Sequence, residues 1–290
     1  MIKQKSFTLI ELLVVIVIIG VIAGVIMVTV SSSVSNATFA RAKAFSSNVQ
    51  NSMLLNLVSE WTFDEGNAND SWGVNDGTLH STTTPIVYWD KSSKKCVFGG
   101  CYEFNGDDYI DCGNVLSTAN SYTFSFWGKI TDLLNNKGIL GFSGTSSNVG
   151  FSKIASNLLL FMNTGNYRYW NASDNKVIDN IENDWHFFTL VVTGFGLTDI
   201  DNAKLYIDGN LMIIGSLSHS NLPMEVNNFL IGKNTYGNYL GLLDDVRIYN
   251  AILSSSQIKQ NYIAGLNSML ANGNISKEEY NQRISKLAQE

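Results

Sequence analysis

The sequence YTFSFW at Tyr122–Trp127 alternates aromatic residues with small polar ones. A similar alternation, AKLYID, occurs at Ala203–Asp208, and His186–Val192 is a denser apolar run. A period of two is typical of a β-strand that buries one face. Turns rich in Gly, Asn and Asp separate these and other short candidate strands between residues 59 and 250. The pattern predicts an antiparallel two-sheet sandwich for this part of the chain.

Several short segments of this region resemble, in the same order, the laminin-G-like members of the concanavalin A-like lectin/glucanase superfamily. They are Trp61–Glu65, Asp76–Leu79, Tyr102–Ile110, Tyr122–Trp127, Asp184–His186, Leu205–Gly209 and Leu243–Tyr249. The resemblance implies a jelly roll whose first and last strands lie side by side. Hydrolases of this superfamily carry two Glu that flank an Asp on one strand, and the sequence lacks that motif. We therefore predict that the protein is not an enzyme.

The N-terminal segment begins with Lys3 and Lys5 and continues as an apolar run from Phe7 to Val30. About 20 apolar residues suffice for a transmembrane helix, and the two lysines favour a cytoplasmic N-terminus. The run contains one acidic residue, Glu11. A carboxylate in hydrocarbon costs roughly 2.5–3.5 kcal/mol, so a plain anchor has no reason to carry it. A subunit that leaves the bilayer and pairs this charge does have a reason.

The sequence FTLIE at Phe7–Glu11 resembles the processing site of type IV prepilins. The resemblance implies cleavage between Ser6 and Phe7 by a prepilin peptidase/methyltransferase, and methylation of Phe7. Ser6 stands where the family usually has Gly. The resemblance also implies that Glu11 directs assembly with other pilin subunits. Pairing Glu11 with the free amine of a neighbouring Phe7 would remove a costly unpaired charge.

The predicted fold is mainly β, with a long N-terminal α-helix, a jelly-roll sandwich and short C-terminal helices. The parts are a leader at residues 1–6, a transmembrane and assembly helix at 7–58, the sandwich at 59–250 and a helical tail at 251–290. In the tail, Ser254 and Ser276 are candidate helix N-caps and Gly273 is a candidate stop. The tail is either an oligomerisation or docking helix pair, or a pair packed on its own domain.

The three cysteines are Cys96, Cys101 and Cys112. Cys96 and Cys101 bracket a tight turn, and export of the domain would favour a disulfide between them. Pairing of Cys101 with Cys112 is the alternative. If Cys112 is left over, we expect it to be buried at the end of a strand.

Two groups of residues are candidates for ligand binding. Many laminin-G-like relatives bind a structural Ca²⁺, which favours oxygen ligands, so Asp64, Asp70 and Asp245 are candidate calcium ligands. Alternatively, Asp64 and Asp245 cap turns or pair with Arg247. Aromatic residues at loops could stack on sugars, as in carbohydrate-binding relatives, or could belong to the core. These aromatic candidates are Trp72, Tyr88, Trp89, Tyr167, Tyr169 and Trp170.

The net charge of −6 and the lack of a Lys/Arg cluster exclude a nucleic-acid partner. Together, these observations predict a type IV pilin-like subunit, in the role of a minor pilin. It would sit in the inner or cytoplasmic membrane before assembly and would then display an extracytoplasmic head on a pilus or cell surface. The head would bind a glycan or a matrix ligand. A membrane-anchored lectin or adhesin that never polymerises is an alternative reading, and so is a secretion-system pseudopilin.

Overall fold

The computed structural model describes residues 9–10, 12–22, 53–116, 121–131, 137–143, 149–154, 157–162, 167–171, 183–193, 199–212, 217–218 and 227–287. The chain divides into two compact units, Met1–Ser52 and Met53–Glu290. In the first unit, residues 9–10 and 12–22 are helical. The predicted processing and assembly residues, Ser6, Phe7 and Glu11, lie outside the described residues, as does the predicted helix between residues 23 and 52. Within the described part of the chain, no helix has the length and apolar character needed to cross a membrane.

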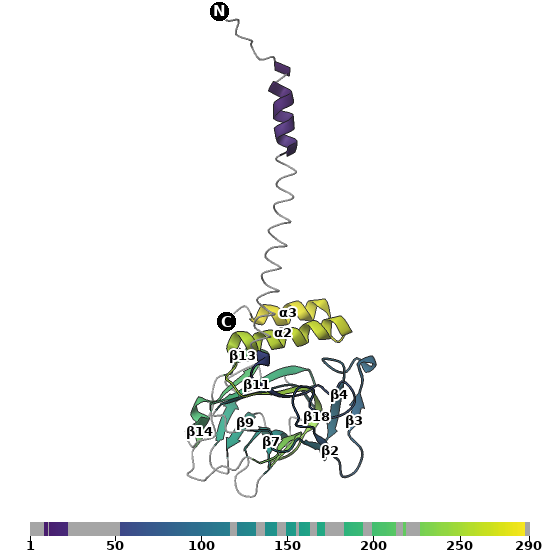
Figure 1. Ribbon diagram of the computed structural model, residues 1–290, viewed down its shortest axis with the longest axis vertical. Helices are drawn as coiled ribbons and strands as arrows, with labels where there is room; N and C mark the ends of the chain where they lie inside the picture. The colour runs from purple at the N-terminus through teal and green to yellow at the C-terminus, as the bar shows by residue number, and fades with distance from the viewer. Residues whose placement is uncertain are drawn as a thin grey trace, which may run out of the picture. The chain divides into compact units, whose positions relative to one another are not determined.

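The second unit contains two packed antiparallel sheets (Figure 1). Sheet A has the strand order β13-β12-β11-β6-β18-β4-β3, and β1 also pairs with β18. Its strands are β1 (Leu57–Trp61), β3 (Val87–Trp89), β4 (Cys101–Asn105), β6 (Tyr122–Ile130), β11 (His186–Val192), β12 (Lys204–Ile207), β13 (Asn210–Leu211) and β18 (Leu240–Tyr249). The predicted antiparallel two-sheet sandwich is confirmed.

Sheet B has the strand order β14-β10-β9-β8-β7-β15-β5-β2. Its strands are β2 (Thr78–His80), β5 (Tyr109–Asp111), β7 (Lys137–Phe142), β8 (Val149–Ile154), β9 (Asn157–Met162), β10 (Tyr167–Asn171), β14 (Leu217–Ser218) and β15 (Phe229–Ile231). A separate hairpin joins β16 (Lys233–Asn234) to β17 (Gly237–Asn238). Short 3₁₀ turns occur at Lys91–Ser93 and Asp199–Asn202.

The first and last strands of the sandwich are neighbours. β1 pairs antiparallel with β18, with Leu57 opposite Tyr249 and Trp61 opposite Val246. The prediction that the N-terminal helix continues to residue 58 is wrong at its end, because β1 begins at Leu57. Leu57, Ser59 and Trp61 are buried while the residues between them are not, so the period is that of a strand.

Aromatic side chains from both sheets fill the core. Trp61 stacks on Phe229 with ring centroids 5.6 Å apart, and Phe229 also stacks on Phe124 at 6.0 Å. Phe126 stacks on Phe188 at 5.1 Å. Such ring pairs contribute beyond the apolar area that they bury. Tyr122, Phe124 and Phe126 of the YTFSFW stretch therefore belong to the core between the sheets, as the alternation predicts.

The C-terminal tail forms α2 (Ser255–Asn272) and α3 (Lys277–Leu287), which lie side by side in Figure 1. Ser254 forms a capping box with Gln257, and Gly273 ends α2 with a φ of 75°. Tyr262 of α2 stacks on Trp127 of β6 at 5.6 Å. Because Phe126 belongs to the core and Trp127 follows it on the strand, α2 covers the outer face of sheet A. The tail thus packs on its own domain, one of the two predicted alternatives.

Candidate functional site

Two pockets lie at the end of sheet B where β5 pairs with β2. The first, here called the loop pocket, has a volume of about 490 Å³. The segment that joins β2 to β3 forms a large part of its lining. Its lining residues are Gly66, Leu79, His80, Ser81, Thr82, Thr83, Thr84, Pro85, Ile86, Tyr88 and Tyr102. The second, the strand pocket, has a volume of about 310 Å³ and is lined by Tyr109, Asp111, Phe142, Ser143, Leu230, Lys233, Asn234 and Thr235. Both volumes fall in the range of roughly 300–1,000 Å³ that is typical of small-molecule sites.

A stack of side chains separates the two pockets. His80 lines the loop pocket and Tyr109 lines the strand pocket, and their rings stack with centroids 4.6 Å apart. The ammonium group of Lys233 lies 4.0 Å from the centroid of Tyr109. β5 lies between β2, which carries His80, and β15, which leads to Lys233. Tyr109 is therefore held by contacts from both sides and serves as a fixed wall.

The structure does not gather the predicted sugar-stacking residues into one place. Trp72 lies in the loop after β1 and is 49% exposed, which suits a contact residue. Tyr167, Tyr169 and Trp170 lie in β10, away from β2 in the order of sheet B, and their side chains fall outside the described ones. The expectation that these three residues occupy a loop is wrong, because β10 pairs with both β9 and β14.

Trp89, like the other aromatic candidate Tyr88, lies in β3 of sheet A rather than in a loop. Its ring nitrogen donates a hydrogen bond to Oε2 of Glu103 at 2.6 Å. The ammonium group of Lys95 lies 3.2 Å from the centroid of its ring. These partners within the domain account for Trp89 without a ligand.

The predicted calcium ligands do not form one metal site. Among the described residues, no group of three or more His, Cys, Asp or Glu side chains could hold a metal ion. Oδ1 of Asp64 accepts a hydrogen bond from the N–H of Gly100 at 2.8 Å. Oδ1 of Asp245 lies 2.9 Å from Nη2 of Arg247, and this ion pair is one of the alternatives predicted for Asp245. Calcium binding stays a prediction, and Asp64, Asp70 and Asp245 do not supply a common site for it.

Asp70 organises the loop between β1 and β2 through backbone hydrogen bonds. Its Oδ1 accepts from the N–H of Glu60 at 3.0 Å, of Trp72 at 3.1 Å and of Gly73 at 2.8 Å. Its Oδ2 accepts from the N–H of Asn75 at 3.1 Å. Burial alone would raise the pKa of Asp70, but these hydrogen bonds stabilise the carboxylate and lower the pKa below its usual value. Asp70 is thus a structural residue.

We expect the Asp70→Asn substitution to lower the free energy of unfolding at neutral pH by about 1–3 kcal/mol. The amide would direct an NH₂ group at a backbone N–H that now donates to a carboxylate. Because the folded-state pKa lies below the unfolded value, this stabilisation is present above the unfolded pKa and is lost as the pH falls. Urea unfolding from about pH 7 to about pH 3 should therefore show a smaller acid-induced loss in the variant. The exposed Glu65→Gln substitution is the control, and equal pH profiles for Asp70→Asn and the wild type would refute this assignment.

The predicted disulfide between Cys96 and Cys101 is confirmed, and Cys112 stays free and buried. The alternative pairing of Cys101 with Cys112 is wrong. Asp244 of β18 anchors the loop that the disulfide closes, because its Oδ2 accepts from the N–H of Val97 at 2.8 Å. Burial raises the pKa of Asp244 well above its usual value.

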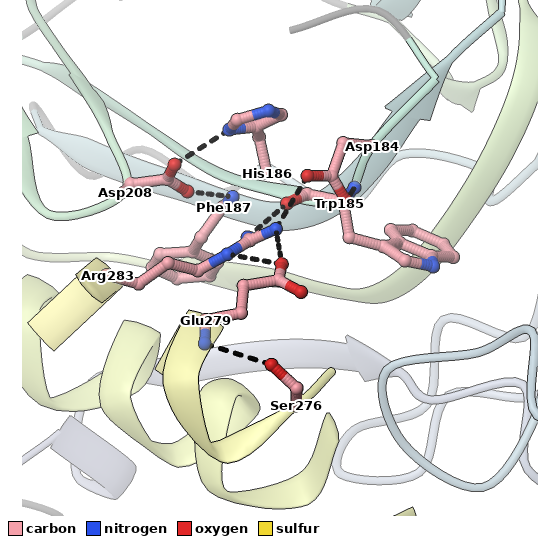
Figure 2. A network of polar contacts seen from close by, with 8 residues as sticks. All are labelled: Asp184, Trp185, His186, Phe187, Asp208, Ser276, Glu279 and Arg283. Atoms are coloured by element: carbon pink, nitrogen blue, oxygen red, sulfur yellow. Dashed lines mark hydrogen bonds and ion pairs between the residues drawn. The ribbon is translucent and has the colours of Figure 1, made fainter. Parts of the chain in front are cut away.

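Arg283 of α3 fastens the tail to sheet A at the start of β11. Figure 2 shows its guanidinium between the helix and the strand. Nη1 donates to the carbonyl of Trp185 at 2.9 Å. Nη2 donates to Oδ2 of Asp184 at 2.6 Å and to Oε1 of Glu279 at 2.7 Å. A planar fork of donors suits this set of partners, which a lysine could not engage in the same way.

His186 and Asp208 form a second set of polar contacts beside those of Arg283 (Figure 2). Its Nδ1 lies 2.7 Å from Oδ2 of Asp208, and Oδ1 of Asp208 accepts from the N–H of Phe187 at 2.9 Å. Burial lowers the pKa of His186, but the Asp208 carboxylate outweighs that effect and raises it. His186 is the first residue of β11. These contacts describe a structural fastening and not an open site.

Sequence reasoning named Tyr88 as a candidate but missed the loop pocket that Tyr88 lines. The available signal was the run of hydroxyl residues at Ser81–Thr84 before Pro85, which is typical of a polar loop. The flanking strands β2 and β3 are only three residues long, so no alternation marks them. The contacts that shape the loop come from Asp107 and Asn105, which are distant in sequence. Lys233 and Tyr109 likewise meet only through the strand order.

Two family models match the chain. Residues 1–27 match the model described as the prokaryotic N-terminal methylation motif, which is the predicted prepilin-type motif. Residues 104–259 match the model described as the concanavalin A-like lectin/glucanases superfamily. Comparison with curated proteins gives no significant match.

Solved structures show the same fold. Domain 4 of AbnA, an extracellular GH43 arabinanase from Geobacillus stearothermophilus, was solved in complex with arabinotriose. It is 19% identical, with a TM-score of 0.52, over 70% of this chain and 97% of that one. The binding domain of botulinum neurotoxin serotype D is 17% identical, with a TM-score of 0.55, over 75% of this chain. The alignment spans only 53% of that neurotoxin chain.

The same serotype D domain was also solved in complex with N-acetylneuraminic acid, and it aligns with a TM-score of 0.54 at 16% identity, over 75% of this chain and 53% of that one. Identities this low establish the fold and leave the ligand open. The match over residues 104–259 covers more than half of the 290 residues. The chain therefore belongs to the concanavalin A-like lectin/glucanases superfamily, and a prepilin-type methylation motif precedes this domain.

Proposed function

We propose that this protein is a type IV pilin-like subunit that displays a carbohydrate-binding head on the cell surface. The observation that carries the proposal is the joining of two parts in one chain. A methylation motif occupies residues 1–27, and a sandwich closed by the pairing of β1 with β18 begins at Leu57. The length of 290 residues is large for the bulk repeating subunit of a filament, which supports a minor pilin.

The assembly half of the proposal assigns roles to three residues. A prepilin peptidase/methyltransferase would cut after Ser6 and methylate Phe7. Glu11 would then pair with the amine of Phe7 in a neighbouring subunit. Pairing matters because an isolated carboxylate among packed apolar helices carries a large desolvation cost. The same pairing gives each incoming subunit a defined register.

The binding half of the proposal has independent support. The loop pocket and the strand pocket have the size of small-molecule sites. Two structural relatives were solved with a sugar, arabinotriose in one and N-acetylneuraminic acid in the other. The sequence lacks the paired-Glu motif of the superfamily's hydrolases. We therefore propose binding without hydrolysis.

Glu11→Leu tests the assembly half in cells that normally make the protein. We expect its amount in the sheared filament fraction to fall by about tenfold or more, while its amount in the membrane fraction stays unchanged. The matched control is Leu12→Val, an apolar exchange in the same run. Wild-type recovery of Glu11→Leu in filaments would refute the role of Glu11. If the wild-type protein occurs in the membrane fraction alone, the non-polymerising anchored lectin replaces this proposal.

A further inference from the structure

A fixed aromatic ring forms part of the wall of the loop pocket. The hydroxyl of Tyr88 donates to the carbonyl of Asp64 at 2.8 Å, and its ring meets Tyr102 edge-on at 5.7 Å. Gly66 lies against the same ring with a φ of +70°, and a Cβ there would come within 3.1 Å of it. Tyr88 is half-buried, so part of it stays accessible from the pocket. These three contacts hold its position before any ligand arrives.

The loop at residues 81–85 adds hydroxyl groups in fixed orientations. The hydroxyls of Thr82 and Thr83 both donate to Oδ2 of Asp107. Both residues line the pocket, and their oxygens keep lone pairs that can accept a hydrogen bond. The hydroxyl of Thr84 instead accepts from Nδ2 of Asn105 at 2.9 Å, which leaves its own O–H to donate. These three threonines, here called the threonine rim, thus offer both acceptors and a donor. A sugar hydroxyl needs this combination because it both donates and accepts.

The charge around the loop pocket favours a neutral ligand. Of the described residues that line it, none is Lys, Arg, Asp or Glu. Behind the rim, hydrogen bonds from Thr83 and Thr82 lower the pKa of Asp107 and so keep it ionised. An anionic ligand would therefore find no Lys or Arg among these lining residues, and the Asp107 carboxylate behind them would repel it. The strand pocket differs, because Lys233 lines it.

We propose that the loop pocket binds the end of a neutral glycan, with a sugar ring against Tyr88 and its hydroxyls bonded to Thr82, Thr83 and Thr84. This inference rests on the proposed carbohydrate-binding function and assigns it a site and a ligand class. A sugar ring has a face of C–H groups and an edge of hydroxyl groups. The C–H face matches the ring of Tyr88, and the hydroxyl groups match the threonine rim. The volume of about 490 Å³ suits a chain end and not a long stretch of polysaccharide.

The test uses the full-length chain, purified in a detergent without a sugar headgroup. The probes are a panel of neutral oligosaccharides that includes arabinotriose and lactose, together with sialylated and sulfated counterparts. We expect binding of a neutral member, with its acidic counterpart about tenfold weaker or worse. The double substitution Thr82→Val and Thr83→Val should lower the affinity for the neutral ligand by about tenfold or more, as measured by isothermal titration calorimetry. Thr78→Val, an exposed threonine on β2 outside the pocket lining, is the matched control and should bind as the wild type does.

A second variant guards against misfolding of the double variant. Thr84→Arg places a bulky side chain in the pocket and leaves both hydrogen bonds to Asp107 in place, so it should also abolish binding. Wild-type affinity in Thr84→Arg, or a preference for acidic glycans, would overturn the pocket assignment while leaving the binding head intact. Binding of no panel member by the wild type would overturn both. The filament assay of Glu11→Leu is independent of either result.

Discussion

Replacing Trp127 by Ala is expected to lower the free energy of unfolding by about 3–5 kcal/mol. Trp127 is fully buried, and its ring contacts Phe187 at 5.3 Å and Tyr262 of α2 at 5.6 Å. Removing the indole leaves a cavity between sheet A and α2 that the rigid sheet cannot collapse to fill. Urea unfolding of the purified chain, followed by far-ultraviolet circular dichroism, measures the loss.

Trp72→Ala is the matched control, since Trp72 is 49% exposed. An exposed site of this kind should change stability by about 0.5 kcal/mol or less. The comparison separates burial against α2 from the general effect of losing an indole. If the two variants unfold at the same urea concentration, α2 does not depend on Trp127 for its place on the sheet.

Arg283→Met is expected to loosen α3 and lower the free energy of unfolding by about 2–3 kcal/mol. The estimate lies below the usual range for a broken buried pair because Asp184 and Glu279 are 52% and 38% exposed and regain water. The buried carbonyl of Trp185 loses its donor and contributes most of the cost. Hydrogen exchange measured by mass spectrometry should show faster exchange across α3 in the variant.

Lys286→Met provides the control for Arg283→Met. It removes a positive charge from an exposed position of the same helix. Its exchange rates across α3 should match those of the wild type. Unchanged protection of α3 in Arg283→Met would show that the packing of apolar residues alone holds the tail, and the network in Figure 2 would then be incidental.

The sandwich was predictable because its central strands carry the required period. The alternating segment Tyr122–Trp127 forms the first part of β6, and the hairpin turn at Asp208–Gly209 joins β12 to β13. The pairing of the first and last strands came from the resemblance to laminin-G-like domains and not from periodicity. The start of β1 was misplaced because the residues before Leu57 are helix-compatible and apolar, and only the pairing with β18 decides between helix and strand.

The tail was predictable as two helices, since Ser254 and Gly273 carry their capping signals in the sequence. Its packing was not predictable. Gly265 in the middle of α2 costs helix stability on its own. The structure supplies the reason, because a Cβ at this position would lie 2.2 Å from the ring of Trp127. At this position the close packing of α2 on sheet A requires a glycine, although glycine has a low helix propensity.

The candidate site was the least predictable part. Acidic residues in a loop can hold a metal or bind the loop's own N–H groups, and sequence spacing does not distinguish the two. Asp70 does the second, with donors from both sides of the loop. The loop pocket depends on contacts between Thr82, Thr83 and Asp107, which only the fold brings together. Such long-range pairs leave no mark in a single sequence.

Assembly of this protein into a filament requires that its prepilin-type leader be removed. The most direct measurement is the mass of the N-terminal peptide of the protein taken from its native cells. We expect a peptide that begins at methylated Phe7, after cleavage behind Ser6. A peptide that retains Met1–Ser6 would show that the leader is not removed and would identify the protein as a single-pass anchored binding domain.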